Sequence, residues 1–292
     1  METRTIDAGG PVHAVDHGGS GVPVLLVHGL GGSHTNWTDL GPRLAGSHRV
    51  LAVDLVGHGF TAPAGRQASI DGHVTLVERT VDALDLGPVV LVGLSMGGLV
   101  AGVAAERSPG RVLGLVMIDP ALPIGAWSVV NRGVLGNIVL PTLPGVGPAL
   151  LNRFVASTTP EEQVADTLEF VAADPDRVSN AHREAAVAMA RARRDMPWAV
   201  ESVVASARSL SALLLRRRHL RRVFERITTP TLVVHGAEDR LVAVESALAL
   251  GRLRPDWDVR ILDGVGHVPP VEAPGETAAI VSSWIDASVP TV

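Results

Sequence analysis

Short apolar runs recur along the chain, and each ends at a glycine or a polar turn. Their near-continuous apolar character is typical of strands that are buried on both faces of a largely parallel sheet. Stretches with helical periodicity lie between them, for example 70–86 and 97–109. The alternation predicts a doubly wound α/β sheet. The strand-like runs are 23–29, 49–59, 88–93, 111–120, 230–236 and 257–267.

This alternation stops after Pro120, and no buried strand is recognisable from there to about residue 228. The segment 159–173, TPEEQVADTLEFVAA, opens with a threonine cap, a proline at the first helical position and two glutamates in the first turn. Residues 179–194 and 198–227 also have helical patterns. A helical insertion therefore separates one sheet strand from the next.

The break predicts an α/β core formed by residues 1–120 and 228–292, with residues 121–227 inserted as a helical lid. Because the insertion follows a strand end, we expect it to lie over the C-terminal edge of the sheet, where open α/β sheets bind ligands. Its first part contains an apolar stretch, 134–151, that approaches the length of a membrane span. Prolines and glycines would break a spanning helix there repeatedly. We expect a lid or pocket wall, and no transmembrane segment.

One basic stretch, 216–226, has the sequence RRRHLRRVFER. Its arginines fall mostly on the faces opposite an apolar stripe, which predicts a solvated helix face rather than a nucleic-acid patch. The stripe consists of Leu213, Leu220, Val223, Phe224 and Ile227.

Composition excludes several chemistries. The chain of 292 residues is 46% hydrophobic and 19% charged, so it can bury a sizeable core. A formal net charge of -5 argues against a general attraction to nucleic acid or an anionic membrane. The sequence has no cysteine and no lysine, which excludes thiol catalysis, cysteine-ligated zinc and Schiff-base chemistry. Acidic residues and glycines near the N-terminus, in place of an apolar signal core, lead us to expect a cytoplasmic protein.

The run VVLVGLSMGGLVAGVAAE, residues 89–106, changes abruptly from a strand pattern to a helix pattern. Gly93-Leu94-Ser95-Met96-Gly97 fits G-x-S-x-G between them, which is the context of a nucleophile elbow. The sharp turn would present the serine hydroxyl above the sheet, and small flanking residues would avoid clashes. A helix N-cap would explain the serine but not the glycines. We therefore interpret Ser95 as a nucleophile.

A serine nucleophile needs a base that works near neutrality, which favours one of the eleven histidines. His267 lies in a loop rich in glycine and proline after the last strand, from which it can reach back over the sheet edge. His34 is a weaker candidate, for lining the pocket. Three other histidines are expected to shape turns or to bond the backbone: His28, His58 and His235.

The histidine in turn needs a carboxylate to hold its tautomer. Asp239 follows a strand end in VVHGAEDRLV, and Asp119 is its competitor after the preceding strand. We favour Asp239 because acid followed by histidine from consecutive strand ends fits the known chain order of residues after a nucleophile elbow. Glu238 should point elsewhere, and Asp54 is interpreted as a turn residue.

Taken together, these segments resemble the α/β-hydrolase superfamily, in the branch of lid-bearing esterases, lipases and meta-cleavage-product hydrolases. The resemblance covers nearly all of 20–120 and 228–287 and leaves the lid unmatched. The matching motifs, in the family's order, are HGLGG at 28–32, DLVGHG at 54–59, GLSMGG at 93–98, HGAEDRLV at 235–242 and GVGH at 264–267.

The resemblance implies the α/β-hydrolase fold, with the helical lid inserted after the sixth strand. It implies an oxyanion hole formed by the backbone N–H groups of Leu30 and Met96, with Gly31 as the alternative to Leu30. The implied nucleophile, acid and base are Ser95, Asp239 and His267.

These features predict a serine hydrolase that cleaves carboxylic esters of hydrophobic small molecules through an acyl-enzyme, with no metal or organic cofactor and no nucleic-acid partner. The apolar first part of the lid favours a hydrophobic acyl or alkyl group, although the same residues would equally serve to pack the lid on the sheet. The predicted pocket lining is Gly31, His34, Trp127, Leu140, Leu143 and Val268.

A carbon–carbon hydrolase of meta-cleavage products would use the same triad. Those enzymes often have asparagine before the nucleophile, Gly-Pro-Gly in the oxyanion loop and tryptophan after the histidine. Here these places hold Leu94, Gly31-Gly32-Ser33 and Val268, which makes this class second in rank. Epoxide hydrolases and haloalkane dehalogenases would need aspartate in place of Ser95. A thioesterase or acyltransferase, a cofactor-free haloperoxidase-like activity and a non-catalytic small-molecule receptor stay open as alternatives.

Overall fold

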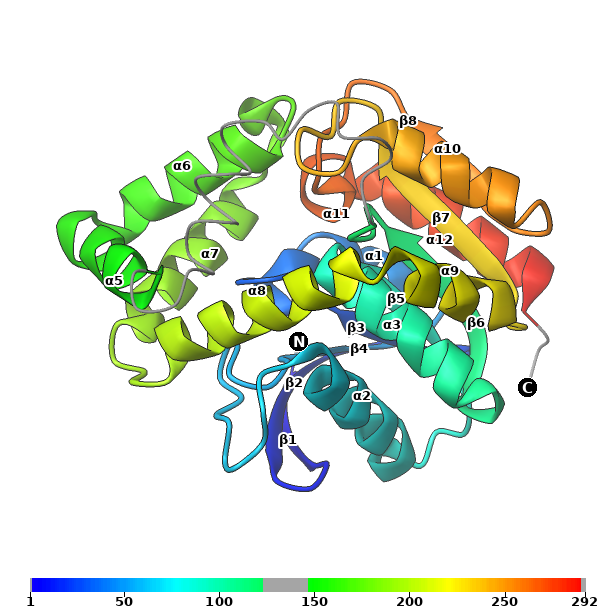
Figure 1. The fold of residues 1–292 in the computed structure, drawn as a ribbon, viewed down its shortest axis with the longest axis horizontal. Helices are drawn as coiled ribbons and strands as arrows, with labels where there is room; N and C mark the ends of the chain where they lie inside the picture. The colour runs from blue at the N-terminus through cyan, green and yellow to red at the C-terminus, as the bar shows by residue number, and fades with distance from the viewer. Residues whose placement is uncertain (1, 123–146, 290–292) are drawn as a thin grey trace.

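The computed structural model describes residues 2–122 and 147–289, and its centre is an eight-stranded sheet (Figure 1). The strand order is β1-β2-β4-β3-β5-β6-β7-β8. The six strands from β3 to β8 run parallel, whereas β2 pairs antiparallel with both β1 and β4. The strands are β1 Glu2–Asp7, β2 Pro11–Gly18, β3 Pro23–Val27, β4 Arg49–Val53, β5 Val89–Leu94, β6 Val112–Ile118, β7 Thr231–Gly236 and β8 Asp258–Leu262.

Helices cover both faces of this sheet, as the sequence predicts for a doubly wound fold (Figure 1). One apolar layer lies under α2, α3, α9 and α10, and the other lies under α1, α11 and α12. The helices of these layers are α1 Leu40–Leu44, α2 Ile70–Leu84, α3 Met96–Arg107, α9 Arg217–Arg226, α10 Val244–Leu253, α11 Pro269–Glu272 and α12 Pro274–Ser288.

The central strands show why the chain forms two layers. Along β3, Leu25 and Val27 belong to the first layer, whereas Val24 and Leu26 belong to the second. Successive side chains of a strand point to opposite faces, so a strand between two helical layers must be apolar at every position. Full burial of each such side chain stabilises the fold by roughly 1.5–3 kcal/mol.

The antiparallel strands β1 and β2 were not predicted from the sequence. β1 is an edge strand in which only Ile6 is buried, and its other positions are polar and exposed. Its sequence, ETRTID, therefore carries none of the apolar signal of a central strand. β2 contributes Val12 and Ala14 to the core but interrupts them with histidine and aspartate.

In the described part of the chain, five α-helices lie between β6 and β7, the position that the sequence predicts for an insertion. The threonine cap predicted at the start of α6 is present, and it is part of a capping box in which Thr159 and Glu162 each accept the other's backbone N–H. The pattern over 198–227 forms two helices rather than one, because the backbone leaves the helical region at Arg216. The first four of these five helices are α5 Gly147–Ser157, α6 Pro160–Val171, α7 Asn180–Arg193 and α8 Ala199–Leu215, and the fifth is α9.

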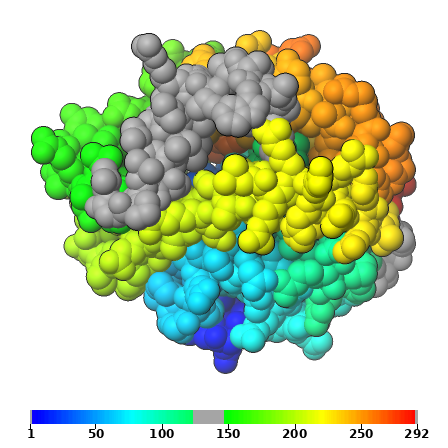
Figure 2. All heavy atoms as spheres, in the orientation of Figure 1, coloured from blue at the N-terminus to red at the C-terminus, as the bar shows by residue number. Residues whose placement is uncertain are grey.

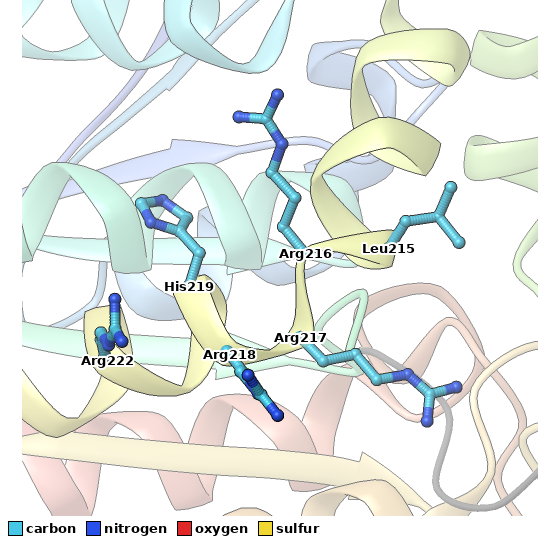
Figure 3. A pocket seen from close by; sticks show the side chains of 6 residues that line it. All are labelled: Leu215, Arg216, Arg217, Arg218, His219 and Arg222. Carbon is cyan, nitrogen blue, oxygen red and sulfur yellow. The ribbon is translucent and has the colours of Figure 1, made fainter.

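The arginine-rich helix α9 presents its basic side chains to solvent, as predicted. Leu220, Val223 and Phe224 are buried against the core. The basic residues at the junction of α8 and α9 are exposed and splay in different directions (Figure 3), and Figure 2 shows these helices as a yellow band across one face. An open pocket of about 580 Å³ lies at this junction, lined by Leu215, Arg216, Arg217, Arg218, His219 and Arg222.

None of the described helices combines the length and the apolar character that crossing a bilayer would require.

Candidate active site

Ser95 lies at the turn between β5 and α3 in a backbone conformation that a residue with a side chain rarely adopts. Its φ is 53° and its ψ is -115°. A Cβ atom added at Gly93 would lie 2.2 Å from the carbonyl oxygen of Gly97, and one at Gly97 would lie 2.1 Å from that of Val27. Only glycine fits at either position, which gives the physical reason for the G-x-S-x-G spacing.

Two backbone hydrogen bonds fix this turn to the neighbouring strand. The N–H of Ser95 donates to the carbonyl of Ile118 at 2.9 Å, and the N–H of Ala121 donates to the carbonyl of Ser95 at 3.0 Å. Ser95 is therefore held at the C-terminal edge of the parallel sheet, where the loops after β7 and β8 also arrive.

His267 connects Ser95 with Asp239 through two short hydrogen bonds. Its Nε2 atom lies 2.9 Å from Ser95 Oγ, and its Nδ1 atom lies 2.7 Å from Asp239 Oδ2. When Nδ1–H donates to the carboxylate, Nε2 is left as an acceptor for the serine proton. The structure thus brings together the three residues that the sequence predicts to be catalytic, from the ends of three different strands.

The carboxylate of Asp239 is held rigidly from behind. Its Oδ1 atom accepts the backbone N–H groups of Leu241 at 2.7 Å and Val242 at 3.0 Å. Burial alone would raise the pKa of Asp239, but the charge and hydrogen bond of His267, with those backbone donors, lower it below its usual value. The carboxyl group is therefore ionised beside the imidazole, as a partner for an imidazolium must be. The adjacent Glu238 is exposed to solvent.

Asp119, the competing acid, follows β6 and contacts Asp239 rather than His267. It is fully buried, and its Oδ1 atom accepts the N–H of Gly236 at 3.0 Å. Burial and the negative charge of Asp239 raise the pKa of Asp119 well above its usual value. Of the two acids, Asp239 therefore has the geometry and the ionisation expected of a triad acid.

The loop after β3 packs directly on Ser95. A Cβ atom at Gly29 would lie 3.3 Å from Ser95 Cβ, so the backbone of Gly29 is in close contact with Ser95. Leu30 is the next residue of this loop. His28 donates from Nδ1 to the carbonyl of Gly29 and accepts the N–H of Leu55 at Nε2, as predicted for a histidine that bonds the backbone. Burial lowers the pKa of His28 to about 4, so the ring stays neutral and keeps both bonds.

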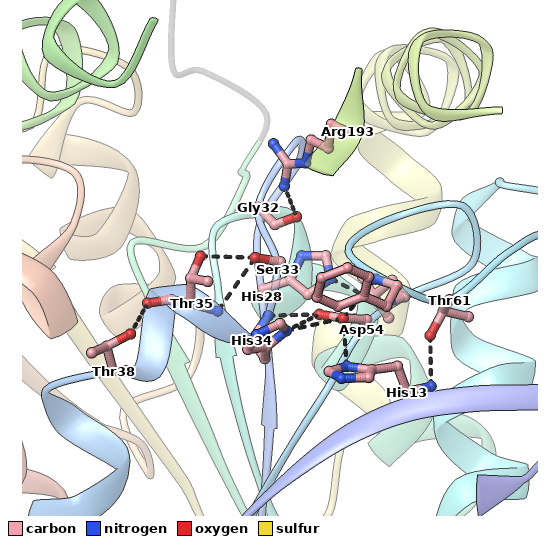
Figure 4. A network of polar contacts seen from close by, with 12 residues as sticks. His13, His28, Gly32, Ser33, His34, Thr35, Thr38, Asp54, Thr61 and Arg193 are labelled. Atoms are coloured by element: carbon pink, nitrogen blue, oxygen red, sulfur yellow. Dashed lines mark hydrogen bonds and ion pairs between the residues drawn. The ribbon is translucent and has the colours of Figure 1, made fainter. Parts of the chain in front are cut away.

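Asp54 organises the next turn of the same loop. Its carboxylate accepts the backbone N–H groups of His34 at 2.6 Å and Phe60 at 2.9 Å, which agrees with its interpretation as a turn residue. The imidazoles of His13 and His34 also contact it, at 2.8 and 3.0 Å (Figure 4). The sequence predicts that His34 lines the pocket. In the structure both its backbone N–H and its imidazole contact Asp54.

Among the described residues, two clusters have donor atoms spaced closely enough for a metal ion: His13 with His34 and Asp54, and Asp119 with His235 and Asp239. In the first, the Asp54 carboxylate already accepts two backbone N–H groups and faces the positive charge of partly buried Arg193. A second cation there would be repelled by Arg193, so hydrogen bonding accounts for this cluster. The second cluster includes Asp239 itself, whose carboxylate is already bonded to His267 and to two backbone N–H groups.

The remaining predicted site residues fall into two groups. Leu30 is partly buried against the core, Met96 is fully buried, and Gly31 has a left-handed backbone with φ 68°. Val268 is 8% exposed and belongs to the second apolar layer. Three residues predicted to line the pocket lie outside the described part of the chain: Trp127, Leu140 and Leu143.

Glu272 is a structural residue of the site that the sequence analysis missed. Its buried carboxylate accepts the backbone N–H groups of Gly266, Ala173 and Asp174 at 2.8, 3.1 and 2.8 Å. The N–H of His267 also donates to the carbonyl of Val171 at 2.7 Å. The end of α6 is thus fastened to the loop that carries His267. An acidic residue in a proline-rich turn gives no sequence signal of burial, because two of its three donors, Ala173 and Asp174, lie far away in the sequence.

The family of the chain follows from this fold and from a direct match. Residues 22–274 match the family model described as alpha/beta hydrolase fold, and the chain belongs to this family.

The chain is similar to three curated relatives whose names describe different activities. It is 30% identical to 2-hydroxy-6-oxo-2,4-heptadienoate hydrolase of Pseudomonas putida, over 92% of this chain and 91% of the relative. It is 27% identical to Lipase 3 of a Moraxella species, over 91% of this chain and 78% of the relative. It is 30% identical to the dihydrolipoyllysine-residue acetyltransferase component of an acetoin cleaving system of Pseudomonas putida, over 88% of this chain but only 61% of that relative's length.

Gly97→Ala should destabilise the protein, because the new methyl group would overlap the carbonyl oxygens of Val27 and His28. We expect a loss of about 1–3 kcal/mol in the free energy of unfolding, measured in urea. Gly110→Ala is the matched control, since a Cβ atom there meets nothing within 4 Å. Equal losses in the two variants would contradict the steric explanation of the motif.

Glu272→Ala should loosen the loop that carries His267, because it leaves the buried N–H of Gly266 and the partly buried N–H groups of Ala173 and Asp174 without their acceptor. A buried donor without an acceptor costs about 1–3 kcal/mol, and water can reach the partly buried donors, so we expect the unfolding free energy to fall by about 1–3 kcal/mol. Glu272→Gln, which keeps one acceptor oxygen, should fall between this variant and the wild type. Glu276→Ala removes an exposed acid of α12 and serves as the control. Equal stability of the Glu272→Ala and Glu276→Ala variants would show that the hydrogen bonds of the Glu272 carboxylate do not stabilise the fold.

Proposed function

We propose that the protein is a serine hydrolase that cleaves carboxylic esters of hydrophobic small molecules through an acyl-enzyme. The observation that carries this proposal is the continuous chain of hydrogen bonds from Ser95 Oγ through His267 to Asp239, at 2.9 and 2.7 Å. A serine hydroxyl is a weak nucleophile until a base takes its proton, and this arrangement supplies the base and the group that orients it.

In the proposed mechanism His267 Nε2 takes the proton of Ser95 as Oγ attacks the ester carbonyl. The carboxylate of Asp239 stabilises the imidazolium that forms. His267 then gives the proton to the departing alcohol, which leaves the acyl group on Ser95. A water molecule, activated by the same histidine, releases the acid and restores the enzyme.

The negative charge on the carbonyl oxygen needs donors that are already in position. We assign this role to the backbone N–H groups of Met96, immediately after the nucleophile, and Leu30, in the loop that packs on Ser95. One such donor typically contributes about 2.7–4 kcal/mol to stabilisation of the transition state. Residues 121–227 would form the lid of this site, and 1–120 with 228–292 its catalytic core.

Carbon–carbon bond hydrolysis is the second candidate, and one observation favours it. The similarity to the heptadienoate hydrolase extends over almost the full length of both chains. That activity would use the same three residues. Leu94, Gly31-Gly32-Ser33 and Val268 stand against it, because they replace residues often found around the site in meta-cleavage-product hydrolases.

Ser95→Ala should lower the rate of p-nitrophenyl ester hydrolysis by about 10⁴-fold or more without changing the melting temperature appreciably. The same substitution should abolish covalent labelling by a fluorophosphonate, since the reacting oxygen is gone. Ser47→Ala, at an exposed serine, is the control and should keep full activity and labelling. Ester turnover that survives in Ser95→Ala would refute the proposed nucleophile.

Substrate class can be decided with one panel of purified wild-type protein. We expect kcat/KM to be higher for p-nitrophenyl esters, with a preference for apolar acyl groups, than for dienoate ketones or thioesters. The measurement is steady-state hydrolysis across ester chain lengths, with the other two substrate classes in parallel. Dominant cleavage of the dienoate ketones would replace the esterase assignment by the carbon–carbon hydrolase.

A further inference from the structure

Asp119 occupies an unusual position immediately after β6. Its φ is 41°, in the left-handed region that a residue with a side chain rarely adopts. Its own N–H donates to the carbonyl of Val234 at 2.9 Å. Ile118, immediately before it, and Ala121, two residues after it, hold the backbone of Ser95. Asp119 is therefore part of the segment that joins the nucleophile turn to the acid loop.

The side chain of Asp119 is sealed from solvent and incompletely hydrogen-bonded as a carboxylate. It is 0% exposed, and its Oδ1 atom accepts one N–H, from Gly236. Within the described residues its Oδ2 atom receives no hydrogen bond. An oxygen of Asp119, a ring nitrogen of His235 and an oxygen of Asp239 lie within 4.8 Å of one another.

The charges around Asp119 make an ionised carboxylate there unfavourable. Asp239 and Glu272 are both acids, and their negative charges repel a second one. His235 is neutral, because burial lowers its pKa, and its Nε2–H donates to the carbonyl of Val242 at 2.8 Å. His267, which takes up a proton during the proposed reaction, is bound to Asp239. An unpaired buried charge costs several kcal/mol, whereas a neutral acid can satisfy its free oxygen by donating.

We propose that Asp119 is a positioning residue of this site: it is held as the neutral carboxylic acid, and its Oδ2–H donates a hydrogen bond to the carboxylate of Asp239. The effect of Asp119 on activity rests on the proposed hydrolase function, whereas its protonation state does not. The proton stays on Asp119 through the reaction, so no group is transferred. The carboxylate of Asp239 is then fixed by donors on three sides: His267, the backbone of 241–242, and Asp119.

The electrostatics of the pair agree with this assignment. Burial raises the pKa of Asp119 well above its usual value, and the charge of Asp239 and the hydrogen bond between the two carboxyl groups raise it further. The same hydrogen bond helps to lower the pKa of Asp239. One proton is thus shared unequally between two acids, and it resides on the one farther from His267.

Stability against pH tests the protonation state without any reference to catalysis. An acid that is neutral when folded but ionised when unfolded makes the protein less stable as pH rises above about 4, the ordinary range of the unfolded group. The amide introduced by Asp119→Asn cannot ionise, tolerates the left-handed backbone and offers the same donor and acceptor. The melting temperature of Asp119→Asn minus that of the wild type should therefore increase from pH 5 to pH 8. A difference that is constant or decreases would show that Asp119 is ionised in the folded protein and would overturn the proposal.

Activity tests the positioning role. Asp119→Gly removes the carboxyl group but suits the left-handed backbone, and we expect kcat to fall about tenfold or more with KM little changed. Asp119→Asn should restore most of this loss, because its amide N–H donates to Asp239. In an Asp239→Ala background the same two substitutions should no longer differ in their rate of fluorophosphonate labelling, since Asp119 would act only through Asp239.

Two activity results would reject the positioning role. Equal losses in Asp119→Asn and Asp119→Gly would mean that a charge is needed, and full activity in Asp119→Gly would mean that the hydrogen bond is dispensable. Failure of the hydrolase proposal has a different signature: the wild type itself would show neither turnover nor labelling. The melting-temperature comparison would still decide the protonation state of Asp119 in that case.

Discussion

The left-handed backbone at Ser95 is the constraint on which the rest of the site depends. A residue with a side chain keeps such a conformation only where the surrounding structure determines it. Here the determinants are hydrogen bonds to Ile118 and Ala121, together with the missing side chains of Gly93 and Gly97. The buried parallel strands provide the rigidity that offsets this strain. Because parallel strands end at the same edge, the hydroxyl emerges where two further loops also end, and a site built from three loops becomes possible.

The imidazole of His267 faces the negative charge of Asp239, and the buried histidines around the site are neutral. Burial keeps His28 and His235 neutral, so that they act as hydrogen-bonding struts rather than as competing cations. Asp239 remains ionised because His267 and backbone N–H groups compensate for its burial. In the proposed mechanism a positive charge appears on His267 and disappears again within each step. A fixed negative charge directly beside the imidazole favours that change, whereas a buried positive charge there would oppose it.

The parallel strands of the sheet could be predicted from the sequence because a strand buried on both faces must be apolar throughout. Ser95 could be found for a similar reason, since the flanking glycines record a backbone requirement. β1 could not be predicted, because an exposed edge strand has no such composition. Glu272 and the contact between Asp119 and Asp239 were also out of reach. A buried acid is identical in sequence to an exposed one, and its partners are fixed only when distant segments meet.

The insertion is joined to the loops of the site mainly by its own backbone groups and by the side chain of Arg193. Val171 accepts the N–H of His267, Glu272 binds Gly266 together with the end of α6, and Arg193 donates to the carbonyl of Gly32 in the loop beside Ser95. Backbone acceptors and donors place little restriction on the side chains that carry them. The side chains of Val171, Ala173 and Asp174 can therefore vary without loss of these hydrogen bonds, whereas replacing Arg193 would remove its bond to Gly32. Backbone links of this kind hold the loop of His267 in place whichever side chains the insertion carries at those three positions.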